Sequence, residues 1–504
     1  MKQITEIFNK YFWLWLGIII IIEFLSFLGY LDSFWGQIFF VGLLVLIFLL
    51  SLFKPALGIQ IILAELIIGS KGYLFSWQTA DSFTISFRLG LFLVIFLIWL
   101  IYLIKDRKIL LLQNSLWKYL SALLFFIFLG TAIALIRGNE LSNIFYDLNG
   151  YLFIGLVLPI FQFIKTRRDL LGLLRVFMAA IVAVVLKTFL LLFVFSHYSQ
   201  TWVTVIYRWI RETGVGEITM LENGLARIFF QSHIYELVAL ILVFSLLMFG
   251  ARLLSKKQKI GLSILAICLS SVVLISYSRS FWLALVFTFL LYFIASWLAA
   301  KEKLVRVFIF CLLLVVIFIS GLALELGIMN IPTGTGGGIS VGDVLITERT
   351  ASLGSESALQ SRFELLPALW QANLEQPIFG AGFGKTVTYE TQDLRYLDMN
   401  NGEATYTTFS FEWGYLGLWL KLGIFGLFVY LLFLLKLIQK GIEAQENVPE
   451  VFEKIVCWSF IFIILLLIII HATTPYLDHP LGFGIIFLAM IIFYLYQQQK
   501  YVKK

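Results

Sequence analysis

The feature that most constrains this chain is the recurrence of apolar runs about as long as a bilayer is thick. A helix needs about 20 residues to cross the hydrocarbon core. Lipid offers the backbone no hydrogen-bond partners, and unbroken runs without alternation exclude a barrel, so each run is expected to be helical. The runs are residues 12–30, 36–53, 88–105, 117–136, 145–164, 172–196, 229–250, 259–276, 280–299, 304–327, 415–437, 455–474 and 481–497, with the shorter 55–69 as a fourteenth. The sequence therefore predicts an all-α, polytopic membrane protein with about 14 transmembrane helices.

Composition supports this class. Hydrophobic residues make up 61% of the chain and charged residues 13%, whereas a soluble domain has roughly a quarter charged residues. The net charge of +7 comes from short basic groups between apolar runs, which is typical of topology signals and not of a nucleic-acid surface. Cys268, Cys311 and Cys457 lie in three different apolar runs, so neither a disulfide framework nor a thiolate metal site is indicated.

The positions of lysine and arginine predict the orientation. They gather in short loops that are cytoplasmic if both termini are cytoplasmic, as the positive-inside rule requires. These loops include residues 105–108, 165–168, 252–259 and 301–306. The predicted organisation is 1–228 with helices 1–7 and an external loop near 197–228, 229–329 with helices 8–11, 330–412 as a large external loop, and 413–504 with helices 12–14.

The external loop 330–412 is polar and rich in glycine. Its segment from Gly380 to Thr386 superficially resembles a phosphate loop, but Phe379 stands where that motif requires glycine and no hydrophobic strand precedes it. A tight turn ending a helix is the simpler interpretation. The run Thr333–Gly338 is expected to be a flexible tether.

Ionisable residues of the apolar runs concentrate toward the predicted outer ends. Lys187, His233, Glu236, Lys421 and His471 lie inside runs, and Arg227, Arg279 and Glu412 lie at or just beyond their outer ends. Charges in lipid are costly and usually face a bundle interior or a wet cavity. For any single residue, snorkelling or an internal pair is an equal alternative. The concentration on one side predicts a polar site in the outer half of the bundle, with Glu23 and Glu65 outside this cluster.

Such a site suits a substrate with an anionic head and a tail that stays in the bilayer, such as a lipid-linked diphosphate. Arginine matches phosphate oxygens in bidentate geometry and keeps its charge. Transfer of a sugar from this carrier requires stabilisation of the departing diphosphate, by fixed cations where no metal serves, and a general base for the acceptor hydroxyl.

Several short motifs then resemble one family. The stretch Ser276-Tyr277-Ser278-Arg279-Ser280 is similar to the Ser-Arg-Gly stretch of the O-antigen ligase and O-antigen polymerase superfamily. Arg362 to Trp370 resembles its Arg-x(7)-Trp pattern, and Pro377-x-x-Gly380-x-Gly382 resembles its Pro-x-x-Gly-x-Gly pattern. Arg227 is similar to a second arginine of that family. The resemblance covers roughly residues 225–430, and the order and spacing of the motifs agree with it.

This resemblance implies a GT-C-like membrane enzyme that moves oligosaccharide from undecaprenyl diphosphate to a glycan or glycolipid acceptor, at the outer face of the bacterial cytoplasmic membrane. It implies no metal, no nucleotide cofactor and no nucleic-acid partner. Arg227, Arg279 and Arg362 would hold the diphosphate. Lys187, His233, Glu236 and Lys421 are further candidates for the substrate site.

One departure concerns the catalytic base. Ligases of this family carry a His-Asn-like pair, nine residues and then Gly-x-x-Gly, whereas this chain has Glu412-Trp413, nine residues and then Gly423-x-x-Gly426. A carboxylate can serve as the base if partial burial raises its pKa. Alternatively, Glu412 pairs with Arg279 or Lys421. The loss of the histidine favours a polymerase over a ligase.

The motif Ser361-x-x-Glu364 predicts a capping box at the start of an amphipathic helix. Phe363, Leu366, Trp370 and Leu374 would share its apolar face, and the helix would cover the site as a lid, kinked at Pro367.

Two other classes of protein remain as alternatives. A transporter or flippase for polysaccharide lipids usually shows internal repeats and central broken helices, and the two halves of this sequence are not similar. The other alternative is a membrane scaffold whose external loop binds a partner.

Overall fold

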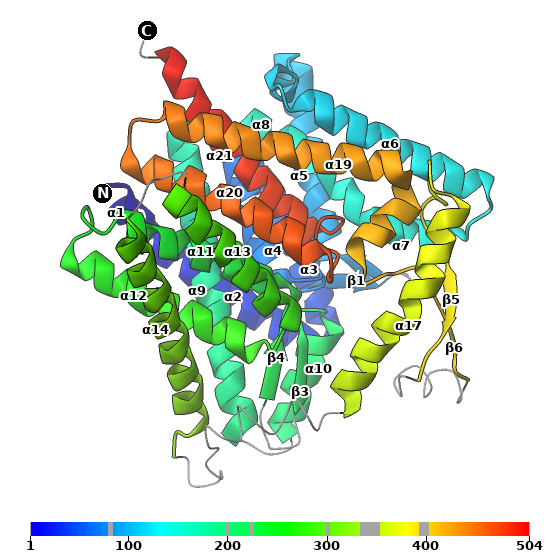
Figure 1. Ribbon diagram of the computed structural model, residues 1–504, viewed down its shortest axis with the longest axis horizontal. Helices are drawn as coiled ribbons and strands as arrows, with labels where there is room; N and C mark the ends of the chain where they lie inside the picture. The colour runs from blue at the N-terminus through cyan, green and yellow to red at the C-terminus, as the bar shows by residue number, and fades with distance from the viewer. Residues whose placement is uncertain are drawn as a thin grey trace.

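The computed structural model describes residues 2–78, 84–197, 201–220, 226–298, 303–332, 353–392 and 403–502 (Figure 1). Within these ranges, 13 helices are long and apolar enough to cross a membrane, and Pro55–Gly69 is a shorter apolar helix. The prediction of an all-α, polytopic membrane protein is therefore confirmed. The expected tether Thr333–Gly338 lies outside the described residues.

The helices of the bundle follow the predicted apolar runs closely. They are α2 (Lys10–Leu31), α3 (Ser33–Phe53), α4 (Pro55–Gly69), α5 (Phe87–Asp106), α6 (Trp117–Ile136), α7 (Leu141–Leu152), η2 (Phe153–Leu156), α8 (Val157–Phe163), α9 (Arg167–His197), α11 (Ile234–Phe249), α12 (Lys256–Ile275), α13 (Arg279–Leu298), α14 (Leu304–Met329), α19 (Gly414–Asn447), α20 (Val451–His471) and α21 (Pro480–Val502). The segment from α7 to α8 forms one span.

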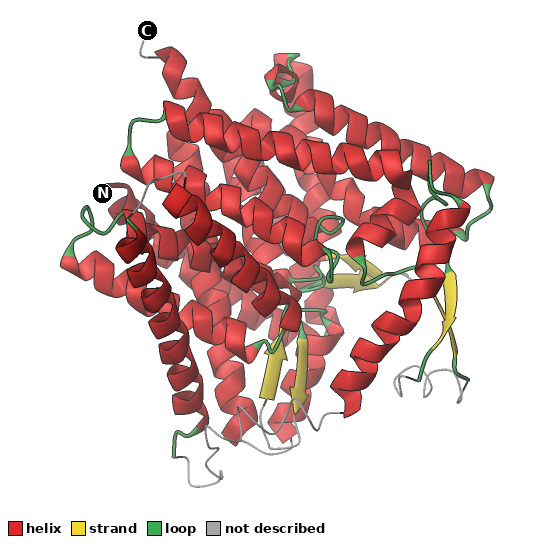
Figure 2. Ribbon diagram, in the orientation of Figure 1, coloured by secondary structure: helices red, strands yellow, loops and turns green. Residues whose placement is uncertain are grey.

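Shorter elements connect these helices. They are α1 (Lys2–Ile7), η1 (Leu110–Gln113), α10 (Thr201–Glu212), η3 (Gln231–His233), the long α17 (Leu353–Glu375), and the strands β1 (Ser76–Gln78), β2 (Thr84–Ser86), β3 (Glu217–Met220), β4 (Ala226–Phe229), β5 (Val387–Glu390) and β6 (Thr405–Thr408). The strands form three antiparallel hairpins, β1–β2, β3–β4 and β5–β6. Figure 2 shows these hairpins on the side of the molecule away from both chain termini.

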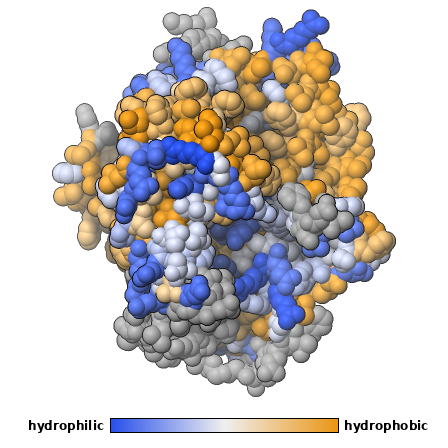
Figure 3. Space-filling view, turned by 90° about the vertical axis from the view of Figure 1, so that its right-hand side faces the viewer, coloured by the Kyte–Doolittle hydropathy of each residue, from blue (hydrophilic) through white to orange (hydrophobic). Residues whose placement is uncertain are grey.

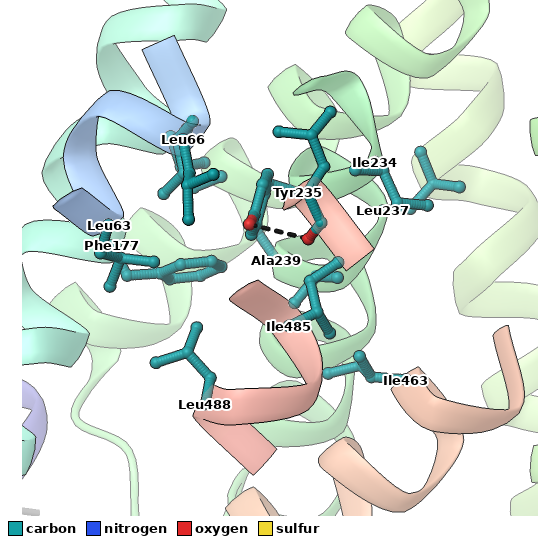
Figure 4. Close-up of a cluster of buried hydrophobic side chains, with 14 of the residues drawn as sticks. Leu63, Leu66, Phe177, Ile234, Tyr235, Leu237, Ala239, Ile463, Ile485 and Leu488 are labelled. Atoms are coloured by element: carbon teal, nitrogen blue, oxygen red, sulfur yellow. Dashed lines mark hydrogen bonds between the residues drawn. The ribbon is translucent and has the colours of Figure 1, made fainter. Parts of the chain in front are cut away.

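The core of the bundle is built from its most buried helices. In the membrane-spanning segment that contains α11, 94% of the residues are buried. In α2 and α3 only 17% are buried, and these helices present most of their surface outward. Tyr235 of α11 is fully buried and donates a hydrogen bond to the carbonyl oxygen of Leu481, 2.9 Å away (Figure 4). Apolar side chains such as Phe177 and Leu488 surround it. A polar group inside the core is thus satisfied, as a low-dielectric interior requires.

Helix ends and loops meet at one end of the bundle, which we call the hairpin end and define by residues 226–233, 276–279 and 472–479. There the hydroxyl of Tyr476 donates to the carbonyl oxygen of Gln231 at 2.8 Å. The first turn of α19 also lies there, because the hydroxyl of Tyr415 contacts the carbonyl oxygen of Ile468, 2.5 Å away. The side of a membrane that this end faces stays a prediction.

The opposite end joins a different set of segments. Arg167 forms an ion pair with Glu450 at 2.8 Å. Gln162 donates to Asp106 at 3.3 Å, linking the end of α8 to the end of α5.

The segment between α14 and α19 contains its own small core, in which α17 packs against the β5–β6 hairpin and α19. The buried side of α17 includes Ser361, Leu365, Leu369 and Asn373. The predicted capping box at Ser361 is wrong, because the helix already begins at Leu353. The residues before Ser361 include good helix formers and extend the helix upstream. The Ser361 hydroxyl lies 2.9 Å from that of Tyr389.

Candidate functional site

The break between α12 and α13 positions Arg279. Tyr277 has a φ of 46°, in the left-handed region, so the chain turns sharply after α12. The Ser276 hydroxyl accepts from the Ser278 amide at 3.3 Å, and the Ser278 hydroxyl accepts from the Phe281 amide at 3.4 Å. These short polar side chains satisfy backbone groups at the break. Arg279 therefore opens α13 with an exposed side chain.

Arg227 reaches the same break from strand β4. Its Nε donates to the carbonyl oxygen of Ser276 at 3.0 Å, and its guanidinium lies 5.2 Å from the ring centre of Phe229. Burial lowers the pKa of Arg227, Glu217 opposes this change, and the charge of Arg279 lowers the pKa further. The guanidinium group of Arg227 nevertheless stays protonated at any physiological pH. The structure thus brings together two of the three predicted arginines at the hairpin end.

Aromatic contacts connect this arginine pair to the loop before α21. The ring of Phe229 lies 5.7 Å from that of Phe281, and Phe281 lies 6.2 Å from Tyr476. The loop of Tyr476 also carries Asp478, which reaches Lys421 of α19. Arg279 and the start of α19 therefore lie at the same end of the bundle.

Arg362 and Glu412 form an ion pair beside the first turn of α19. The indole Nε1 of Trp413 donates to the carbonyl oxygen of Arg362 at 2.8 Å, which fixes α17 against this turn. Half of the Glu412 side chain is exposed, at 50%, against 35% for Arg362. The described ion partner of Glu412 is therefore Arg362, and not Arg279 or Lys421 as the sequence alternatives had it.

Lys421 forms ion pairs with two carboxylates. Its Nζ lies 2.6 Å from Asp147 Oδ1 and 3.3 Å from Asp478 Oδ2, and all three side chains are nearly buried. The other oxygen of Asp147 accepts from the Gly384 amide at 2.9 Å. This buried network joins α7, α19, the loop before α21 and the turn after α17. Asp147 and Asp478 were not among the residues predicted for the site.

The Pro-x-x-Gly-x-Gly segment is the turn that follows α17, as predicted. The Ala381 amide donates to the Leu420 carbonyl at 2.6 Å, and the Ile424 amide donates to the Pro377 carbonyl at 2.9 Å. Gly382 has a φ of 85°, and a Cβ there would lie 2.6 Å from the Ala134 nitrogen of α6. Gly423, with a φ of 73°, makes the kink in α19 that receives this turn. The glycines of the motif therefore serve close packing.

Lys187 forms an ion pair with Glu23 of α2, at 2.8 Å to each oxygen. The rings of Trp209 and Phe230 lie within cation–π distance of its Nζ, at 5.3 and 5.5 Å. The sequence placed Glu23 outside the charged cluster, and this was wrong because Glu23 is the partner of one of its members. Glu65 forms a separate buried pair with Arg88, at 2.8 Å.

His233 is held by internal contacts. Its Nδ1 accepts from the Phe230 amide at 3.3 Å, and its Nε2 lies 3.2 Å from the Thr188 hydroxyl. Glu236, one turn later, is fully buried, and its carboxyl oxygens have no hydrogen-bond partner among the described residues. His471 is also buried and accepts from the Leu477 amide at 3.1 Å. None of these hydrogen bonds involves Arg227 or Arg279.

The sequence did contain one signal for the missed carboxylates. Asp147 is the acidic residue of the run 145–164, and an intramembrane charge predicts a partner. Asp478 follows α20 in a loop, where acidic residues are common, so nothing local distinguished it. Among the residues that the structure describes, no group of three or more His, Cys, Asp or Glu is arranged to hold a metal ion.

Comparison with known proteins identifies the region that carries these features. Residues 264–431 match the family model described as O-antigen ligase. This segment is an O-antigen ligase domain. It contains Arg279, Arg362, Glu412 and Lys421, and the predicted resemblance to the O-antigen ligase superfamily is confirmed. The domain supports a membrane glycosyltransferase-like function in polysaccharide biosynthesis. No curated protein and no solved structure matches the chain.

Proposed function

We propose that the protein is a metal-independent glycosyltransferase that transfers or polymerises oligosaccharide from undecaprenyl diphosphate onto an acceptor hydroxyl, at the outer face of the cytoplasmic membrane. One observation carries this proposal. Arg227 and Arg279 converge on the break between α12 and α13, inside or directly beside the O-antigen ligase domain. Two permanent cations at the end of a membrane bundle suit a diphosphate whose lipid tail lies in the bilayer.

The arginines would stabilise the leaving group. In the transfer, the acceptor oxygen forms a bond to the anomeric carbon while the bond from that carbon to the diphosphate oxygen breaks. Negative charge develops on the diphosphate as this bond lengthens. Preorganised guanidinium groups at this position stabilise the transition state more than the ground state, which is the requirement for catalysis.

Glu412 would accept the proton of the acceptor hydroxyl. Its side chain is half exposed and reachable from outside the bundle. The motif resemblance aligns it with the histidine of the family's ligases. In the structure, Glu412 is paired with Arg362. A diphosphate carries more charge than a carboxylate and competes for Arg362. Donor binding would thus draw Arg362 to the phosphates and leave Glu412 ready to act as the base.

The remaining candidate residues would have a positioning role, because each contacts groups on other segments of the bundle. Lys187 and Lys421 hold carboxylates, and His233 accepts from a backbone amide. Glu236 is buried in the first turn of α11. We propose that these four residues keep the segments around the arginines in place and do not bind the donor directly. The glutamate in place of histidine favours polymerisation over ligation.

The experiment is a product assay with the purified protein in lipid nanodiscs. The substrate is undecaprenyl-diphosphate oligosaccharide, and EDTA is present in one arm. The proposal predicts longer or transferred glycan together with released undecaprenyl diphosphate, at the same rate in both arms. Movement of the lipid across a vesicle bilayer without new glycosidic bonds would instead support the flippase. Activity that EDTA abolishes would contradict metal independence.

The role of Glu412 has its own test. Glu412→Gln keeps the size of the side chain but removes the proton acceptor, so the rate should fall by about 100-fold or more. The matched control is Glu375→Gln, an exposed glutamate on α17. The wild-type rate should decline on acidification and the residual rate of Glu412→Gln should not. An unchanged rate and pH profile in Glu412→Gln would remove Glu412 as the base.

A further inference from the structure

Helix α17 has three distinct faces. The first is buried against β5, β6 and α19 and includes Leu365 and Leu369. The second is exposed but apolar, with Phe363, Trp370 and Leu374 at 55%, 49% and 55% exposure. Their spacing of seven and four residues places them on one side of the helix. The sequence grouped these residues correctly. Phe363 and Trp370 touch the rings of Trp413 and Trp419 at their edges, with centroids 5.9 and 5.5 Å apart, and about half of each side chain still faces outward.

The third face is exposed and polar. It carries Gln360, Gln371 and Glu375, which lie beside the apolar face around the helix. Gln371 directly follows Trp370, and Glu375 directly follows Leu374. A helix in water has no reason to expose an apolar stripe next to a polar one. This division is typical of a helix that lies at a boundary between lipid and water.

Contacts with α19 place each part of α17 along that helix. Arg362 is held by Trp413, just before α19 begins. Asn373 donates to the Leu416 carbonyl at 3.3 Å, and Trp419 and Ile424 both donate to the Pro377 carbonyl, at 2.8 and 2.9 Å. With a rise of about 1.5 Å per residue, Ile424 lies about 15 Å along α19. The end of α17 therefore lies farther along α19 than Arg362 does, and α19 runs inward from the external side in the predicted topology.

The apolar face also continues into the outward surface of the membrane helices. Ile378 and Phe379, directly after α17, are 49% and 52% exposed, and Phe425 of α19 is 54% exposed. Arg137, at the end of α6, donates to Gln376 at 2.5 Å, so α6 and the end of α17 are neighbours. Ile136 of α6 is 85% exposed. Figure 3 views this side of the molecule, and hydrophobic residues cover most of its upper part.

We propose that the apolar face of α17 lies in the acyl chains of the outer leaflet, so that membrane lipid is the partner of this surface. Leu374 and the following turn would be deepest, and Phe363 would lie near the headgroups. One consequence rests on the proposed function: the anchored helix would hold Arg362 at headgroup level, where the diphosphate of a lipid-linked donor lies.

Site-directed spin labelling of the full chain in nanodiscs tests this surface. The native Cys268, Cys311 and Cys457 are first replaced, and single cysteines are then introduced as Phe363→Cys, Trp370→Cys and Leu374→Cys. Matched controls on the polar face are Gln360→Cys, Gln371→Cys and Glu375→Cys. Each control is at nearly the same depth as its counterpart. The measurement compares collision of the label with oxygen, which enriches in lipid, and with a water-soluble nickel chelate.

The proposal predicts a higher ratio of oxygen to nickel accessibility at 363, 370 and 374 than at the paired controls, rising from 363 to 374. Nickel accessibility equal to that of the controls would show a face in water and overturn the proposal. Low accessibility to both reagents would show a face covered by protein and would overturn it as well. Since no donor is present, failure of the proposed function would leave these outcomes unchanged. If a variant does not elute as a monodisperse protein as the parent does, the comparison is made at the other two positions.

Discussion

Lys421 Nζ lies 2.6 Å from Asp147 Oδ1, deep in the bundle. This contact connects the O-antigen ligase domain to a helix that precedes it in the chain. Asp147 in turn accepts from the Gly384 amide, so the pair also fixes the turn after α17. The ligase domain is therefore packed into the amino-terminal helices and does not stand apart from them.

Loss of Lys421 should destabilise the protein strongly. Lys421→Met leaves Asp147 and Asp478 buried without their cation, and breaking a buried ion pair by removing one partner costs about 3–5 kcal/mol. The control is Lys440→Met, whose partner Glu443 is 37% exposed, for which about 0–1 kcal/mol is expected. Thermal unfolding in detergent measures both. Equal shifts for the two variants would contradict a structural role of the buried network.

The sequence predicted the membrane helices closely because each apolar run reports its own environment. It did not predict the partners of Lys421 or Lys187, because an ion pair between distant helices leaves no local pattern. Helical periodicity showed that Phe363, Trp370 and Leu374 share a face. It contained no information on what lies against that face, about half of which is exposed in the structure.

The turn after α17 should not tolerate a side chain at Gly382. Gly382→Ala would place a Cβ 2.6 Å from the Ala134 nitrogen and 2.7 Å from the Gly130 oxygen of α6. Gly138→Ala is the control, since Gly138 has a φ of 70° but nothing lies within 4 Å of the added Cβ. The control isolates the backbone strain of about 1–2 kcal/mol. A larger fall of the melting temperature is expected for Gly382→Ala, and a similar fall in both variants would refute the close packing.

Acidification should destabilise the loop before α21 through His479. Burial lowers the pKa of His479 to about 3, and the cations Arg88 and Lys71 contribute to this shift. Its Nδ1 accepts from the Leu481 amide at 3.2 Å, and protonation would remove this acceptor.

The unfolded chain binds this proton first, because an unperturbed histidine has a pKa near 6.5. The contribution of neutral His479 to the free energy of unfolding is therefore fully present above about pH 6.5. It falls as the pH decreases toward 3, by about 2 kcal/mol at pH 5. Melting temperatures between pH 7.5 and 5 should decline more steeply for the wild type than for His479→Gln. Identical slopes would show that His479 titrates normally.

The measurement that tests the central claim most directly is glycan transfer by Arg279→Ala in the nanodisc assay. Arg306→Ala is the control, because Arg306 is an exposed arginine near the opposite end of the bundle. Removing one preorganised donor typically costs about 100-fold or more in rate. We predict at least that loss for Arg279→Ala with an unchanged melting temperature, and wild-type turnover for Arg306→Ala. Wild-type turnover by a folded Arg279→Ala protein would contradict the account.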